Sequence, residues 1–208
     1  MAGGNNTITI PGSGYSNISV GNGNNTITIS GSGDNYISVG NGNNTINLSG
    51  TSSGTSGYNY YDNISIGSGS NTITLGSGAG QINNIDVNNY YNNATTLGAN
   101  TINNVNSNDS IVFSPQSNTI NLLNSTLGTE STVSLATEIT NLQHLDTAAG
   151  DVSVGWTTAA GNTYVVMDNN TGSGNVDQVI QIVGSAPYLT SSSQISNPTA
   201  YHLVYVTL

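Results

Sequence analysis

The chain contains no lysine and no arginine, whereas it carries ten acidic residues and a formal net charge of -10 at pH 7. A surface without cationic side chains cannot neutralise phosphate groups, which excludes nucleic acid and anionic membranes as partners. Cysteine is absent as well, and its absence excludes disulfides and thiolate metal sites. No apolar run approaches the roughly 18 residues of a membrane-spanning helix. We therefore expect neither nucleic-acid binding nor membrane insertion.

Charged residues of both signs make up only 5% of the 208 residues, against about 25% in ordinary soluble domains. Polarity comes instead from Asn, Ser, Thr and Gly. Neutral side chains of this kind stack on copies of themselves without repulsion, which favours repetitive β-structure and contact with a second copy. The first residues lack a basic region followed by a long apolar run, so we expect no cleavable secretory signal.

The sequence does contain an internal repeat of 19 residues, made of two glycine-led segments of nine and ten residues. Each segment reads Gly-x-Gly-x-Asn-x-Ile-x-Ile, and the alternating tail predicts a short strand with one buried face. Each period therefore predicts two short strands joined by two glycine turns. The segments open at Gly12, Gly21, Gly31 and Gly40, and apolar residues recur 19 apart at Ile8, Ile27 and Ile46 and at Ile10, Ile29 and Leu48.

The repeat continues less regularly towards residue 125. Its register resumes at Ile64 and Ile66 after an inserted segment at about 51–58, which we interpret as a surface loop. We count roughly five or six coils and predict a two-sheet parallel β-roll, or β-solenoid, as a first domain over residues 1–125.

A different pattern begins near residue 126. Four leucine and isoleucine residues between 135 and 145 lie at helical spacing, and Gly150 follows as a stop signal. Residues 151–184 predict three strands joined by turns, and YHLVYVTL at the C-terminus predicts an alternating strand. We expect a mainly all-β chain with a small α+β C-terminal domain at 126–208, made of one helix, a β-hairpin and a terminal strand.

The glycine-led segments resemble the RTX repeats of bacterial exported proteins, whose nonapeptide reads Gly-Gly-x-Gly-x-Asp-x-(large apolar)-x. In that family the aspartate and the turn carbonyls hold calcium between neighbouring coils. Aligning GNGNNTITI with this motif puts asparagine where the family has aspartate. Only Asp62 keeps the carboxylate among the equivalent positions, which are Asn6, Ser16, Asn25, Asn35, Asn44, Asp62, Asn71 and Asn83.

Asparagine in these turns favours hydrogen bonds over bound metal. Calcium takes six to eight oxygen ligands, and its affinity rises with the number of carboxylates. An amide carries both a donor and an acceptor and can bond to its own kind from coil to coil. We therefore expect that no cofactor is required and that a ladder joins Asn6, Asn25, Asn44 and Asn71.

Calcium remains the alternative at two places. One is Asp62, the single retained aspartate of the repeat. The other is a glycine-containing turn with Asp168, Asn170 and Asp177, which lacks the later ligands of an EF-hand. The alternative for this second place is a hairpin turn capped by its own side chains.

The C-terminal third resembles a second feature of the same family. The segments AAGDVSVGW, GNTYVVMDNN and GNVDQVIQIVG are similar to the C-terminal region of RTX-related surface-layer proteins exported by type I secretion. In those proteins a hairpin precedes an apolar strand and an uncleaved signal. The resemblance implies export in one step to the surface of a Gram-negative cell.

No pattern of catalysis is found. The two histidines, His144 and His202, are accompanied by no Gly-x-Ser-x-Gly elbow. The acidic residues are scattered rather than paired, and the recurrent Gly-x-Gly lacks the lysine of a phosphate loop. We predict that the protein is not an enzyme.

Threonines alternate with the apolar residues of one strand in each repeat and are expected to project outward. A flat Thr-x-Thr grid also occurs in β-solenoid ice-binding proteins, which the chain resembles in this respect only. Threonine is a common outward strand residue as well, so ice binding is one alternative function. Tyrosines in the inserted segments are interpreted as a subunit interface: Tyr58, Tyr60, Tyr61, Tyr90 and Tyr91.

The first coil favours self-assembly. A solenoid needs terminal caps because an exposed end presents unpaired backbone groups, yet the repeat starts at Ala2 with no cap sequence before it. The uncharged YHLVYVTL is typical of a strand that pairs with another chain. We expect an extracellular structural protein that polymerises head to tail into a filament, sheath or surface layer, as in a biofilm matrix.

The expected partners are further copies of the chain and cell-surface polysaccharide. A calcium-dependent adhesin is the remaining alternative function. The expected interface residues lie in the first strand and the last one: Asn5, Thr7, Ile8, Ile10, Tyr201, Leu203, Tyr205 and Leu208.

Overall fold

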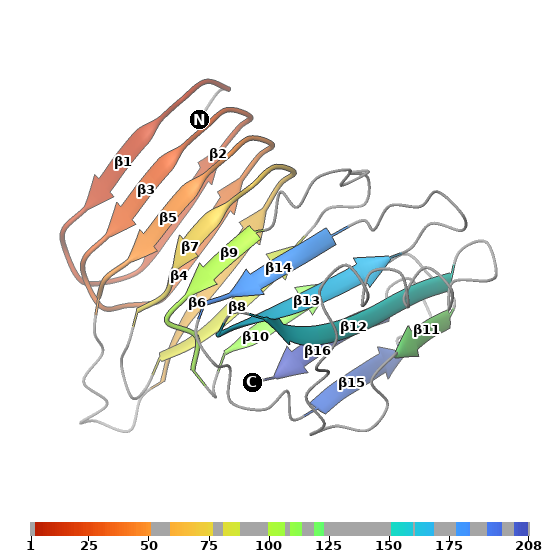
Figure 1. Ribbon diagram of the computed structural model, residues 1–208. Helices are drawn as coiled ribbons and strands as arrows, with labels where there is room; N and C mark the ends of the chain where they lie inside the picture. The colour runs from red at the N-terminus through yellow and green to blue at the C-terminus, as the bar shows by residue number, and fades with distance from the viewer. Residues whose placement is uncertain are drawn as a thin grey trace.

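The computed structural model shows a strand-rich chain built from two β-sheets (Figure 1). No helix occurs among the residues that it describes, and none of these residues belongs to an apolar helix long enough to cross a membrane. The predicted helix near 135–145 and the inserted segment 51–58 lie outside the described residues. The structure describes residues 3–50, 59–76, 81–87, 100–106, 109–113, 119–122, 151–159, 161–168, 178–183, 191–196 and 202–207.

Nine of the described strands form sheet A and seven form sheet B. In spatial order, sheet A consists of β1 (Thr7–Ile10), β3 (Thr26–Ile29), β5 (Thr45–Leu48), β7 (Thr72–Thr74), β9 (Asn100–Asn103), β14 (Gln178–Ile182), β13 (Asn162–Asp168), β12 (Asp151–Ala159) and β11 (Thr119–Leu122). Sheet B consists of β2 (Ser16–Val20), β4 (Asn35–Val39), β6 (Tyr60–Ile66), β8 (Gln81–Val87), β10 (Ser110–Phe113), β16 (His202–Thr207) and β15 (Ser191–Ser196).

Successive strands from β1 to β10 alternate between the two sheets, and neighbours within each sheet are parallel. Thr7 pairs with Thr26 and Thr26 with Thr45, so partners lie 19 residues apart. Thr45 pairs with Thr72 across 27 residues, and the difference of eight equals the length of segment 51–58. The insertion therefore leaves the side-chain register of sheet A unchanged.

Alternating apolar side chains from both sheets meet in one core. Ile27 and Ile46 of sheet A are 0% exposed and Ile64 of sheet B is 1% exposed. Full burial of such a side chain stabilises a fold by about 1.5–3 kcal/mol. Ile8 and Ile10 occupy the same positions in β1 but are only partly buried, because β1 has no neighbour on its outer side.

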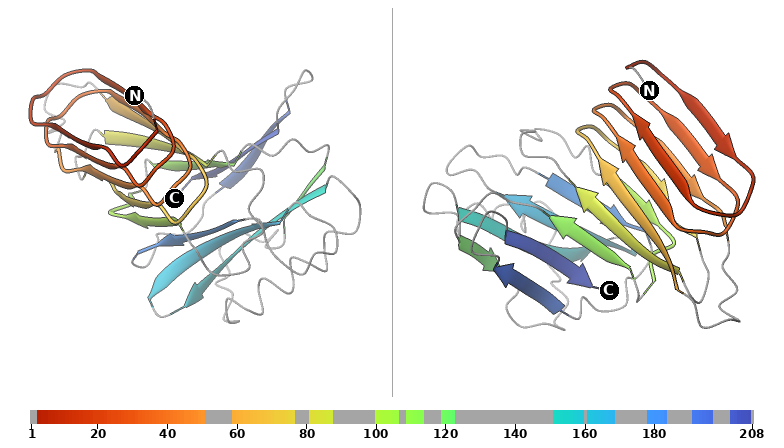
Figure 2. Two further views of the ribbon diagram at one scale, coloured as in Figure 1. Left: turned by 90° about the horizontal axis from the view of Figure 1, so that it is seen from above. Right: turned by 180° about the vertical axis from the view of Figure 1, so that it is seen from behind.

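The C-terminal strands extend both sheets. In sheet A, β14 lies parallel beside β9 and is followed by antiparallel β13 and β12. In sheet B, β16 lies antiparallel between β10 and β15. Figure 2 shows the first repeats at one end of the molecule and these later strands at the other. Both sheets thus continue across the boundary that the sequence predicts near residue 125.

Candidate functional site

A column of asparagines joins the turns that lead into sheet A. In each repeat the side-chain Nδ2 donates to Oδ1 of the next asparagine, over distances of 2.8, 2.9, 2.9 and 2.9 Å. The backbone N–H of the same residue donates to the same Oδ1, at 3.0 to 3.1 Å. This amide column consists of Asn6, Asn25, Asn44, Asn71 and Asn100.

The Nδ2 atoms of the first four asparagines in the amide column each donate to two or three oxygen atoms. Asn25 Nδ2 donates to the carbonyl oxygens of Gly21 (3.2 Å) and Gly23 (2.8 Å) as well as to Asn44 Oδ1 (2.9 Å). A cation bound between repeats would need this same nest of oxygens. The amide nitrogen already fills it, and no cluster of three His, Asp or Glu side chains exists in the described part of the chain. The amide column therefore does not fit a calcium row.

A second column, which we call the acid column, joins the turns that lead into sheet B. Asn35 donates from Nδ2 (2.7 Å) and from its backbone N–H (3.1 Å) to Asp62 Oδ1. Asn83 donates in the same way to Asp109 Oδ1, at 2.7 and 3.0 Å. All four side chains are buried. Asparagine and aspartate thus alternate along the acid column.

Two side-chain oxygens of the acid column have no hydrogen-bond donor. In the amide column the Oδ1 of each asparagine from Asn25 onward receives an N–H from the previous side chain, but Asp62 has an oxygen where that nitrogen would be. Accordingly Asn83 Oδ1, which follows Asp62, is buried without a hydrogen-bond partner, and so is Asn35 Oδ1, which follows Ser16. A buried acceptor without a donor costs about 1–3 kcal/mol.

The carboxyl groups of Asp62 and Asp109 have raised pKa values because both are buried. Burial raises the pKa of the Asp62 carboxyl, against the lowering effect of the hydrogen bonds from Asn35 and Gln81. Burial likewise raises the pKa of Asp109, which also receives the Asn106 backbone N–H on Oδ2 at 2.8 Å. A proton on the second oxygen of Asp62 would supply the donor that Asn83 Oδ1 lacks.

The acid column is a poor calcium site. Asp62 offers one carboxylate, whose Oδ2 already accepts a hydrogen bond from Gln81 Nε2. The amide oxygens of Gln81 and Asn83 are buried without partners, which gives three neutral or singly charged ligands where calcium takes six to eight. In the other predicted loop, Asp168 ends β13, whereas Asn170 and Asp177 lie outside the described residues.

Glycine permits the close approach of successive turns. A Cβ on Gly31 would lie 2.1 Å from the Gly12 carbonyl oxygen, and a Cβ on Gly42 would lie 2.4 Å from that of Gly23. At both positions a side chain would collide with the backbone of the preceding repeat. A Cβ on Gly12 would meet nothing within 4 Å, because no described residue covers the outer side of the first repeat.

The predicted interface residues fall at different places. Asn5 and Thr7 are exposed at the open end formed by β1 and β2, and Asn5 Oδ1 accepts the Asn24 backbone N–H at 2.8 Å. Leu203 and Tyr205 belong to β16, whose two edges are paired with β10 and β15. This differs from the expectation of a strand with a free edge, because an uncharged strand pairs as readily within the chain. Tyr201 and Leu208 lie outside the described residues.

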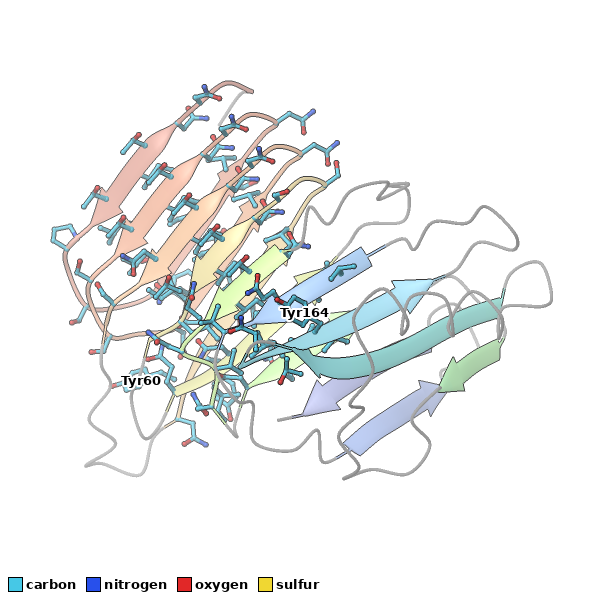
Figure 3. All side chains as sticks on the ribbon, in the orientation of Figure 1. Tyr60 and Tyr164 are labelled. Carbon is cyan, nitrogen blue, oxygen red and sulfur yellow. The ribbon has the colours of Figure 1, made fainter. Side chains whose placement is uncertain are left out.

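Two columns of hydroxyl and amide side chains run across the outer face of sheet A, and Figure 3 shows the rows of sticks along its first strands. Neighbouring members of a column lie about 4.8 Å apart, and the two columns lie about 7 Å apart. The first column consists of Thr7, Thr26, Thr45, Thr72 and Thr101, and the second of Thr9, Thr28, Asn47, Thr74 and Asn103.

Sequence reasoning missed Asn100 of the amide column, Asp109 of the acid column, and Gln81, which donates a hydrogen bond to Asp62. Asn100 could have been found, because it opens the same Asn-Thr-Ile triplet as Asn6 and Asn25. Gln81 and Asp109 carry no such signal, because only strand pairing brings them close to Asp62 and Asn83.

No protein-family model matches the chain, and no curated protein and no solved structure is significantly similar to it. Its likeness to the RTX repeats is therefore a likeness of motif, carried by the glycine spacing and by the position of the asparagines and Asp62.

Proposed function

We propose that the protein is an extracellular structural protein without catalytic activity, exported in the manner of type I secretion substrates. In this proposal the two parallel sheets form an RTX-like β-solenoid of 19-residue coils, and further copies of the chain stack on its first coil to build a filament or layer. Support comes from the open end of both sheets, where β1 and β2 have no outer neighbour among the described strands. Unpaired strand edges are templates for further strands.

The single observation that carries this proposal is the empty space beside Gly12. Its backbone φ is not positive, and the space beside it is empty, so the isolated chain has no need of glycine there. Its counterpart Gly31 must be glycine because a turn packs against it. A glycine at the open end is suited to a turn of another molecule packing against it in the same way.

The amide column also supports the addition of a further copy at the first coil. Oδ1 of Asn25 receives two N–H groups from Asn6, whereas no described residue donates to Oδ1 of Asn6. This oxygen can therefore accept hydrogen bonds from an asparagine of a further copy of the chain. At the opposite end the edge strands are β11 and β15, so a head-to-tail contact would pair one of them with β1 or β2 and would not close on itself.

Gly12→Ala tests this proposal. We expect the variant to keep the melting temperature of the wild type, because the added methyl group meets no atom of its own chain, and to lose the ability to form filaments or layers in electron micrographs. Thr45→Ala, on the outer face of sheet A, is the matched control and should assemble normally. A wild-type protein that stays monomeric at high concentration, with and without calcium, would contradict the proposal, as would normal assembly of Gly12→Ala.

Ice binding is a second candidate because register places five threonines in one straight column of sheet A. The four at Thr7, Thr26, Thr45 and Thr72 are exposed. A regular array of this kind can order water at a crystal surface. Thermal hysteresis that disappears in Thr28→Tyr would support this function, and absence of hysteresis in the wild type would exclude it.

A further inference from the structure

Three tyrosines are exposed on strands or turns of sheet B near the first repeats. Tyr15 is 66% exposed, Tyr36 46% and Tyr61 43%. They stand out because the other large apolar side chains of these repeats form the core, and exposed aromatic groups that cluster mark interaction sites. We call Tyr15, Tyr36 and Tyr61 the tyrosine patch.

Register brings the three rings together. Tyr36 pairs with Asn17 on one side and with Asn63 on the other. Its diagonal neighbours are therefore Tyr15, which directly precedes β2, and Tyr61 of β6, each two residues before the paired asparagine. The rings of Tyr15 and Tyr36 have centroids 5.6 Å apart and are inclined at 44°. The two outer tyrosines lie two strand spacings apart, about 10 Å, which is comparable with the length of two linked pyranose rings.

Amide and carboxyl groups surround the patch. Asn17 Nδ2 donates to the Tyr15 hydroxyl at 3.4 Å, and Asp34 Oδ1 accepts the Tyr61 backbone N–H at 2.8 Å. Asn63 Oδ1, beside Tyr36, accepts from Asn84 Nδ2 at 3.2 Å. No cation is present, since the chain has no lysine or arginine.

We propose that the tyrosine patch binds a neutral, β-linked glucan. The electron-rich faces of tyrosine rings attract the C–H groups that cover the flat face of such a sugar. Neighbouring amides offer the paired donors and acceptors that sugar hydroxyls need. The carboxylate of Asp34 and the net charge of -10 repel anionic polysaccharides.

The tyrosine patch lies on the outer face of sheet B, but Tyr15 directly precedes β2, an edge strand of the proposed assembly contact, so glucan binding has to be measured apart from end-to-end assembly. The two activities are separated by placing all patch variants in the Gly12→Ala background as well as in the wild type. If Gly12→Ala still binds the glucan, the patch acts in a single molecule. Failure of assembly then leaves the glucan proposal unaffected, and failure of glucan binding leaves the assembly proposal unaffected.

The experiment measures binding to amorphous cellulose by sedimentation of the insoluble polymer, with cellohexaose as competitor. The wild type should bind, and the triple variant Tyr15→Ala, Tyr36→Ala and Tyr61→Ala should bind at least about tenfold more weakly. The triple change to Phe should bind like the wild type because it keeps the rings. Tyr164→Ala in β13, labelled in Figure 3, is the matched control.

Four results would overturn the proposal. The wild type could fail to bind cellulose, or the triple alanine variant, shown to be folded by circular dichroism, could bind as well as the wild type. Alternatively the triple alanine variant could change sedimentation of the sugar-free protein, which would assign the patch to contact between copies. Equal binding to alginate, an anionic polysaccharide, would likewise contradict recognition of a neutral chain.

Discussion

The amide column and the acid column occupy the same place in their sheets, two residues before the first buried isoleucine of each strand. Asn44 of the amide column and Asp62 of the acid column each accept a backbone N–H and a side-chain N–H from the preceding repeat on Oδ1. The two columns differ in the second side-chain atom, which is nitrogen throughout the amide column and oxygen at Asp62 and Asp109. One atom decides whether the next rung receives a donor.

The consequence is visible in the buried acceptors. Within the described part of the amide column every side-chain oxygen after the first rung has a donor, whereas the acid column leaves Asn35 Oδ1 and Asn83 Oδ1 without one. In an all-asparagine column every side-chain oxygen after the first has a hydrogen-bond donor at any pH, because the amide group does not titrate. An alternating column of asparagine and aspartate depends on the protonation of its carboxyl groups, so the two sides of the molecule should respond differently to pH.

An acidic residue in the amide column should have the largest effect on stability. Asn25→Asp places a carboxylate oxygen against the carbonyls of Gly21 and Gly23 and against Asn44 Oδ1. We expect the free energy of unfolding at pH 7 to fall by about 3 kcal/mol or more, measured by urea denaturation. Acid or millimolar calcium should recover part of the loss.

Asn24→Asp is the matched control for this change. The neighbouring Asn24 is exposed and uses its Oδ1 only to accept the Asn43 backbone N–H at 2.8 Å. A carboxylate does the same, so the variant should change stability by no more than about 0.5 kcal/mol. If both variants lose equal stability, added charge and not the nest of oxygens is responsible.

The reverse change should repair the acid column. Asp62→Asn supplies the missing N–H to Asn83 Oδ1 and removes a buried carboxyl, and a rotation of the Gln81 amide would let its unpartnered oxygen accept as well. We expect a gain of about 1–2 kcal/mol in the free energy of unfolding at pH 7. A loss of stability would show that Asp62 has a different partner in the folded protein.

The wild type should also lose stability as pH rises. The raised pKa values of Asp62 and Asp109 mean that the folded chain holds these protons more tightly than the unfolded chain. Their contribution is therefore complete below about pH 3.9, the ordinary aspartate value, and declines as pH rises through the folded-state pKa values.

Urea unfolding between pH 3 and pH 8 measures this decline. Replacing both Asp62 and Asp109 with Asn should flatten the profile, while Asp86→Asn, which removes one charge from β8 outside the acid column, should leave the slope in place. An unchanged slope in the double variant would assign the pH dependence to overall charge.

The smallest effect is expected from metal removal. Neither column offers enough oxygen ligands for calcium, so chelation with EDTA should shift the melting temperature by less than about 2 °C, measured by circular dichroism. Unfolding on chelation would show that bound metal, and not hydrogen bonds between asparagines, joins the turns. Asn25→Asp, which gains a carboxylate, provides the contrast, because its stability should depend on calcium.

Much of the first half of the molecule could be predicted from short patterns. The Asn-Thr-Ile triplets locate the amide column and the alternating isoleucines locate the buried face, because both follow from a strand period of two residues. The positions of β14 and β16 could not be predicted. Their pairing with β9 and β10 links segments separated by stretches without any repeat, and several uncharged strands of the chain would satisfy the same edges.

The chemistry of the protein follows from its sequence alone: glycine turns, neutral asparagine side chains in those turns, an outward threonine face and no lysine or arginine. Which side chains contact one another depends on the tertiary structure. Asp62 meets Asn35 across 27 residues and Asn83 meets Asp109 across 26, so irregular insertions set the neighbours of each rung. The sequence around a residue predicts whether its side chain lies in a turn or in the core. Whether the hydrogen bonds of that side chain are completed depends on the residue stacked before it.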